Sequence, residues 1–148
     1  MQALPHHYQV EASGAPEGAI VVTPKGVAPL ATDAPPEFGG PQGQWSPESL
    51  LVASVADCYV LSFRAVARAS RLPWDALCVS AEGVLDRVEG VTRFTGFTVK
   101  ARLTLPEGVQ ESLARTVMDK AKRACLMTNS LIAPCELVAS IDKAASAG

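Results

Sequence analysis

One long apolar stretch, "SPESLLVASVADCYVLSFRAVARASR" at residues 46–71, constrains the fold more than any other feature. Its apolar residues recur at the spacing of an α-helix. Ser46 suits the capping position of a helix, Pro47 suits its first turn, and Glu48 places a negative charge where the helix dipole favours one. Because Pro73 prevents continuation, the sequence predicts a helix that ends shortly before this proline.

The predicted helix is apolar over a wide arc. At about 100° per residue, its charged side chains gather on one face. These charged residues are Asp57, Arg64, Arg68 and Arg71. Another face collects Leu51, Val55, Cys58, Ser62, Ala65 and Val66, with Val52, Tyr59 and Phe63 beside it. A helix of this kind is expected to be buried, in the centre of the fold or at a subunit interface.

Composition indicates one globular domain over residues 1–148, because 148 residues with 48% hydrophobic content can form a sizeable core. The net charge of −2 is spread along the chain, so we expect neither a nucleic acid nor a membrane as a partner. We also expect no apolar run of transmembrane length. The N-terminal "MQALPHHYQ" does not resemble a secretory signal, and a cytoplasmic location is expected.

The remaining pattern predicts an α+β fold, an antiparallel sheet with two main helices. Strands are expected in "YQVEAS" and "AIVVTP", which the turn "GAPEG" joins, in the hairpin of "LCVSAEGVLDRV" and "FTGFTVKARLTL", and in "CELVASID". A second helix is expected from Pro106 to Cys125, followed by a turn or short helical segment in "LMTNSLIAP". The segment "VAPLATDAPPEFGGPQGQW" is expected to be a long irregular connection, and the tail "KAASAG" to fray.

The chain has four cysteines, Cys58, Cys78, Cys125 and Cys135. No C-x-x-C pair occurs and the two histidines are adjacent, so the sequence gives little support to a metal site. Cys78 and Cys135 lie in predicted strands between apolar residues, and we interpret both as small core residues. Cys58 and Cys125 lie on or at the end of the two predicted helices. Periodicity alone leaves both packing and chemistry open for them.

Two motifs resemble the OsmC/Ohr family, the osmotically induced protein C and organic hydroperoxide resistance proteins. The first is "GGPQGQWSPESLLVASVADCYVLSFRAVAR", in which a Pro-Glu pair opens the helix and Cys58 follows ten residues after Glu48. The second is "CLMTNSLIAP", in which Asn-Ser-Leu closely follows Cys125. The resemblance extends from about Tyr8 to Asp142.

This resemblance implies an OsmC-like fold, in which the central helix is buried at the interface of an intertwined homodimer. It implies a thiol-dependent peroxidase that reduces organic hydroperoxides in the response to oxidative stress. Cys58 matches the peroxidatic cysteine, Cys125 the resolving cysteine and Glu48 the active-site glutamate. A Cys58 sulfenic acid would condense with Cys125, and an external dithiol such as a lipoylated protein would reduce the disulfide. No metal or organic cofactor is implied.

The chain departs from the family in its cations. The family uses an arginine from the N-terminal region, whereas the first arginine of this chain is Arg64. Lys25 could supply a positive charge without the planar fork of arginine. The other candidates are the arginines of the predicted hairpin, Arg87, Arg93 and Arg102. Asp57 is a second departure, and we interpret it as a partly exposed, ion-pairing member of the charged face.

Glu48 has two interpretations. Ten residues of helix span about 15 Å, so Glu48 cannot reach Cys58 of its own chain and would act at the partner subunit's Cys58. A bare carboxylate would raise the pKa of the thiol, so this role requires Glu48 to orient a cation. Alternatively, Glu48 is simply a favourable charge at the start of the helix.

The missing arginine leaves alternatives to a peroxidase. One is a redox-sensing dimer, or one that binds a small apolar ligand, with a Cys58 of ordinary reactivity. Another is a structural dimer in which both cysteines only fill space.

Overall fold

The computed structural model describes residues 1–145, and Ser146–Gly148, the end of the predicted tail, lie outside the described residues. The chain packs into two compact units, Met1–Leu51 and Val52–Gly148. The boundary falls within the long helix α1 (Pro47–Ala69). The expectation of a single domain stays a prediction.

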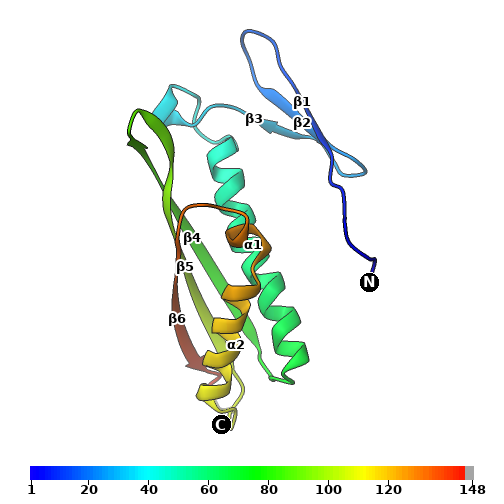
Figure 1. Cartoon of the computed structure of the whole chain (residues 1–148), viewed down its shortest axis with the longest axis vertical. Coiled ribbons are helices and arrows are strands. Elements are labelled where there is room, and N and C mark those ends of the chain that lie inside the picture. The colour runs from blue at the N-terminus through cyan, green and yellow to red at the C-terminus, as the bar shows by residue number, and fades with distance from the viewer. Residues whose placement is uncertain (146–148) are drawn as a thin grey trace. The chain divides into compact units, whose positions relative to one another are not determined.

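The first unit contains a three-stranded antiparallel sheet in the order β1 (Val10–Ser13), β2 (Ile20–Pro24), β3 (Leu30–Thr32). The predicted hairpin of β1 and β2 is confirmed (Figure 1). The segment expected to be irregular is more ordered than predicted, since it holds β3 and the 3-10 helix η1 (Pro36–Phe38). At Gly40, a side chain would place its Cβ 1.7 Å from the Ala34 carbonyl oxygen, so this turn requires glycine.

Reciprocal hydrogen bonds cap the start of α1. The Ser49 N–H donates to Ser46 Oγ at 3.1 Å, and the Ser46 N–H donates to Ser49 Oγ at 2.9 Å. Two backbone donors that a helix start leaves without partners are satisfied in this way. The predicted capping role of Ser46 is confirmed.

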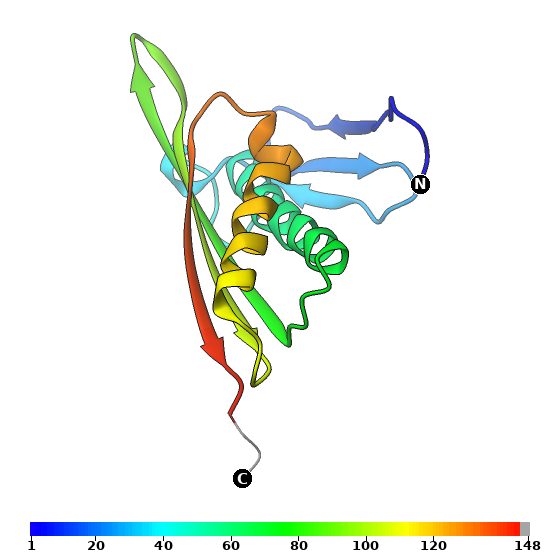
Figure 2. The ribbon, with the colours of Figure 1, turned by 60° about the horizontal axis from the view of Figure 1, so that its bottom comes forward.

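In the second unit, a sheet in the order β4-β5-β6 supports helices on one face (Figures 1 and 2). Strands β4 (Ala76–Val88) and β5 (Val91–Leu105) form the predicted antiparallel hairpin. Its turn has positive φ at Glu89 and Gly90, which matches the right-handed twist of the strands. Strand β6 (Cys135–Lys143) runs parallel to β5, because helix α2 (Glu111–Ala124) carries the chain back along the sheet. The α+β class is confirmed, with one mixed sheet in place of a purely antiparallel one.

Helix α2 begins five residues later than predicted, at Glu111 instead of Pro106. Gly108 has a φ of +80°, and Gln110 is extended with φ −74° and ψ 126°. These conformations interrupt a helix, so residues 106–110 form a turn and the helix starts after it.

The core of the second unit lies between α1, α2 and β5. Helix α1 buries a narrow stripe at every fourth residue, formed by Val55, Tyr59, Phe63 and Ala67. Helix α2 buries Ala114, Val117, Met118 and Ala121, and β5 buries Phe97, Val99, Ala101, Leu103 and Leu105. The Tyr59 hydroxyl donates to the Met118 carbonyl oxygen at 3.0 Å, which joins the two helices inside this core.

Two expectations about apolar residues need correction. Helix α1 is long enough to cross a membrane, and an 18-residue window within it has a mean hydropathy of 1.7. Length and composition alone do not distinguish such a span from the core helix of a soluble protein. Cys78 is exposed and not part of the core, because alternation along β4 directs it to the sheet face opposite the helices.

We predict that Tyr59→Phe lowers the free energy of unfolding by about 1 kcal/mol, since it removes one buried hydrogen bond while keeping the ring. Chemical denaturation measures this change. Tyr8→Phe is the matched control, because Tyr8 is 87% exposed and should leave stability unchanged. Equal stability of Tyr59→Phe and the unchanged protein would contradict a stabilising role for this contact.

Candidate active site

Cys58 lies in the middle of α1 and is half-buried. Ser62 follows one helical turn later, and its Oγ lies 3.9 Å from the Cys58 sulfur. Both thus lie on one face of the helix. The sequence pattern places Ser62 only on the apolar face of the helix, although its i+4 spacing from Cys58 also predicts a contact with the thiol.

Cys125 forms the C-terminal cap of α2 and is only 2% exposed. Its backbone is extended, and the short helix α3 (Leu126–Asn129) begins directly after it. Cys125 thus opens the segment, residues 125–134, in which the chain reverses between α2 and β6.

Polar residues of the second motif hold this reversal in place. Thr128 Oγ1 donates to the Cys125 carbonyl oxygen at 3.3 Å, and the Asn129 N–H donates to the same oxygen at 3.1 Å. The Asn129 side-chain amide donates to the Arg123 carbonyl oxygen at 3.0 Å, in the last turn of α2. The Thr-Asn pair thus binds the carbonyl oxygens that the end of the helix leaves free. This gives a physical reason for these residue types after Cys125.

The structure brings Cys58 and Cys125 together in the second unit, and both are free thiols. Burial raises the pKa of Cys58, but hydrogen bonds outweigh it and hold the pKa below its ordinary value. The donors, from the largest effect down, are the Met127 N–H, the Cys125 thiol, the Ser62 hydroxyl and the Leu126 N–H. A nucleophilic thiol needs this shift, because the thiolate is the reactive form.

Backbone amides of the reversal therefore contribute to the site, which sequence reasoning missed. No residue type marks an amide as a donor, so only the three-dimensional arrangement reveals Leu126 and Met127. Among residues 1–145, no cation contributes to the lowered pKa of Cys58.

The hairpin arginines lie elsewhere. Arg102 lies on the sheet face opposite the helices, where its guanidinium is 3.9 Å from an Asp142 carboxylate oxygen. Arg87 and Arg93 are exposed on the hairpin. Asp57 is exposed as expected, but within the described part of the chain no salt bridge joins it to an arginine.

Glu48 belongs to the first unit, in the first turn of α1. Its Oε2 is buried and has no hydrogen-bond partner among the described residues. A buried carboxylate oxygen without a donor is costly, so this atom requires a partner that the described chain does not provide.

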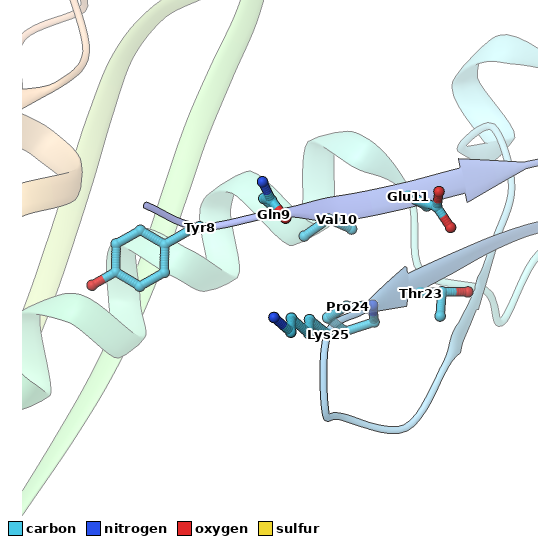
Figure 3. A pocket seen from close by; sticks show the side chains of 7 residues that line it. All are labelled: Tyr8, Gln9, Val10, Glu11, Thr23, Pro24 and Lys25. Atoms are coloured by element: carbon cyan, nitrogen blue, oxygen red, sulfur yellow. The ribbon is translucent and has the colours of Figure 1, made fainter. Parts of the chain in front are cut away.

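Lys25, the cation suggested by sequence, also belongs to the first unit. It is exposed at the end of β2 and lines an open hollow with Tyr8, Glu11 and Thr23 (Figure 3). Figure 3 shows Tyr8 just before β1 and Lys25 just after β2, so both side chains lie at the same end of the strand pair. Within residues 1–145, no group of three histidine, cysteine or acidic residues could hold a metal ion.

We predict that Ser62→Ala raises the pKa of Cys58, because it removes one donor to the thiolate. Iodoacetamide reacts with the thiolate, so the midpoint of the Cys58 alkylation rate against pH should move to higher pH. Below that midpoint, Cys58 of the variant should react more slowly. Peptide mass spectrometry resolves each cysteine, and Cys78 serves as an internal control. Identical Cys58 profiles would contradict a role for Ser62.

Known proteins resemble this chain in both sequence and fold. A sequence model of the OsmC-like protein family matches residues 39–139. The organic hydroperoxide resistance protein of Xanthomonas axonopodis pv. citri (strain 306) is 32% identical over 124 residues, which cover 80% of this chain and 82% of that protein. The uncharacterized protein YmaD of Bacillus subtilis (strain 168) is 24% identical over 106 residues, which cover 70% of this chain and 71% of the relative.

Solved structures share the fold. An OsmC-like protein of unknown function from Vibrio cholerae aligns with a TM-score of 0.79 at 17% identity, over 93% of this chain and 100% of the other. The organic hydroperoxide resistance protein OsmC from Legionella pneumophila aligns with a TM-score of 0.74 at 24% identity, over 95% and 99% of the two chains.

Proposed function

The chain belongs to the family of OsmC-like proteins, and from this premise we propose that it is a thiol-dependent peroxidase that reduces organic hydroperoxides to alcohols. The observation that carries the proposal is the thiol pair, in which a half-buried Cys58 of lowered pKa contacts a buried Cys125. The name of the Xanthomonas relative, an organic hydroperoxide resistance protein, supports the substrate class.

The proposed reaction uses both sulfurs. The Cys58 thiolate attacks the outer oxygen of the hydroperoxide, the O–O bond breaks, and the alkoxide takes a proton and leaves as an alcohol. Cys58 is now a sulfenic acid. The Cys125 sulfur attacks it, a disulfide forms and water leaves. An external dithiol, of the class of a lipoylated protein, then reduces the disulfide by exchange.

The lowered pKa of Cys58 favours a peroxidase over a dimer that only senses or binds a ligand, because those alternatives predict ordinary thiol reactivity. Hydrogen bonds to the sulfur take over part of the work that an arginine performs in the family. The leucines, valines and alanines of α1 suit an alkyl peroxide better than hydrogen peroxide. A cycle that returns both thiols to the reduced state requires a reducing compartment, which supports a cytoplasmic location.

We include Glu48 in the proposed site through a second copy of the chain. The buried Oε2 of Glu48 lacks a donor among residues 1–145. A cation held by this carboxylate would stabilise the thiolate at the partner subunit's Cys58, as the spacing along α1 requires. Lys25 is the only lysine or arginine before Glu48 in the chain, and we propose it as this cation.

A homodimer is also part of the proposal. Helix α1 buries only its narrow stripe within one chain, while Leu61 is 51% exposed. A second copy would cover the rest of this apolar surface, which a soluble protein rarely leaves open.

We expect the cysteines to differ in their effects on peroxide reduction. In a coupled assay with tert-butyl hydroperoxide and a dithiol, Cys58→Ser should fall to the uncatalysed rate, because it has no nucleophile. Cys125→Ser should still consume one equivalent of peroxide and accumulate a Cys58 sulfenic acid, which dimedone traps. Cys78→Ser should match the unchanged protein, because Cys78 is exposed on the far face of the sheet. Free thiols after peroxide treatment of the unchanged protein would overturn the peroxidase.

We expect sedimentation to show a dimer, and Leu61→Asp to raise its dissociation constant roughly tenfold or more, because the change buries a charge in the interface. Val138→Asp is the matched control, since Val138 is 44% exposed on the opposite face of the sheet. Dissociation by Val138→Asp with an intact Leu61→Asp dimer would count against an interface formed by α1.

A further inference from the structure

A third cysteine, Cys135, lies near enough to Cys125 for the charge of Cys125 to act on it. Cys135 is the first residue of β6 and is half-buried. Along β6, Cys135 shares its face with Leu137 and Ala139, which are less exposed than Glu136 and Val138 on the other face. Cys135 therefore faces the side of the sheet on which α2 packs.

Cys135 is accessible from a surface hollow of about 360 Å³. The last turn of α2 contributes Lys122 and Arg123 to this hollow, and the segment before β6 contributes Asn129 and Ile132. Cys125 lies between these two segments in the chain, at the break between α2 and α3. Residues on both sides of Cys125 in the sequence thus line the hollow, and Cys135 lies on its wall.

We propose that Cys135 is a third redox thiol, which takes over the disulfide from Cys58 by exchange at Cys125 and presents it to an external dithiol in this hollow. The inference rests on the proposed peroxidase for the origin of the first disulfide. It adds a residue and an access route that the two-cysteine cycle does not contain.

The exchange neither consumes nor produces electrons. The Cys135 thiolate attacks the Cys125 sulfur of the Cys58–Cys125 disulfide, the bond to Cys58 breaks, and Cys58 leaves as a thiolate. The Cys135 thiol gives up one proton before attack, and Cys58 is free to react with the next peroxide. One thiol of the external dithiol then attacks Cys135 and releases Cys125, and its second thiol breaks the resulting mixed disulfide, releases Cys135 and closes the dithiol into a disulfide.

The pKa values of Cys58 and Cys135 shift in opposite directions, and this difference favours transfer of the disulfide to Cys135. Burial raises the pKa of Cys135, Lys122 opposes this effect, and the charge of Cys125 adds to it. Hydrogen bonds hold the pKa of Cys58 below its ordinary value in spite of burial. A thiol with a stabilised thiolate is the better leaving group and favours its reduced form. The disulfide therefore moves from Cys58 towards Cys135.

Exposure supports the same route. Cys125 is 2% exposed, so a bulky reductant cannot reach its sulfur. Cys135 is half-buried on the wall of an open hollow, where a dithiol can approach its sulfur. Transfer to Cys135 places one sulfur of the reducible bond on the wall of this hollow.

The first test is independent of peroxide chemistry. Cys58→Ser, in the full-length folded protein, is oxidised with diamide and its disulfides are mapped by peptide mass spectrometry. We expect a Cys125–Cys135 linkage within one chain as the main product. Adding Cys78→Ser should not change it, since Cys78 is exposed on the opposite face of the sheet. Absence of the Cys125–Cys135 linkage would overturn the inference, whether or not the protein is a peroxidase.

The second test follows the transfer itself. One equivalent of alkyl hydroperoxide is added to the reduced protein, and samples are quenched with acid over time. We expect the Cys58–Cys125 linkage to decline as Cys125–Cys135 rises. In Cys135→Ser, the ratio of the reduction rate by dithiothreitol to the oxidation rate by peroxide should fall roughly tenfold, because the accessible sulfur is lost. Cys78→Ser should keep the ratio. An unchanged ratio in Cys135→Ser would overturn the relay and leave the two-cysteine peroxidase intact.

Discussion

The packing of α1 against α2 at Tyr59 is the contact on which the candidate site depends. The Tyr59 hydroxyl binds the Met118 carbonyl oxygen inside a core of small and aliphatic side chains. Cys58 directly precedes Tyr59, and Cys125 ends α2 two helical turns after Met118. This buried hydrogen bond and the core around it therefore hold the two helices at the positions where the distant cysteines meet. A shift of either helix would disturb both the core and the spacing of the two sulfurs.

The chain reversal after α2 supplies the chemistry that the helices position. Its amides at Leu126 and Met127 donate to the Cys58 sulfur, and Thr128 and Asn129 bind the carbonyl oxygens left free at the end of the helix. The same turn thus ends a helix and stabilises a thiolate. This arrangement accounts for a lowered pKa in a chain whose first arginine is Arg64, because neutral donors favour the charged form of a thiol without a cation.

Periodicity and capping predicted the elements well, since these depend on neighbouring residues. The limits of α1 followed from Ser46 and Pro47, and the hairpin from alternation around Glu89 and Gly90. The late start of α2 and the parallel pairing of β6 depend on backbone angles and on the path of the chain, which no local pattern carries. The same limit explains why the sequence pattern predicted a buried Cys78 that the structure places on an exposed face. Apolar neighbours in sequence suggested a buried Cys78, but the two faces of its sheet differ in what covers them.

The four thiols differ in exposure, since Cys125 is buried, Cys58 and Cys135 are half-buried and Cys78 is exposed. A peroxidatic sulfur must exclude reductants that would compete with peroxide, and a resolving sulfur must stay close enough to capture a short-lived sulfenic acid. Both demands favour burial, as for the 2% exposed Cys125. Reduction by a protein-sized dithiol demands the opposite, an accessible sulfur. A third thiol on an open wall would supply that accessible sulfur while Cys125 stays buried. Cys135, on the wall of its hollow, holds that position.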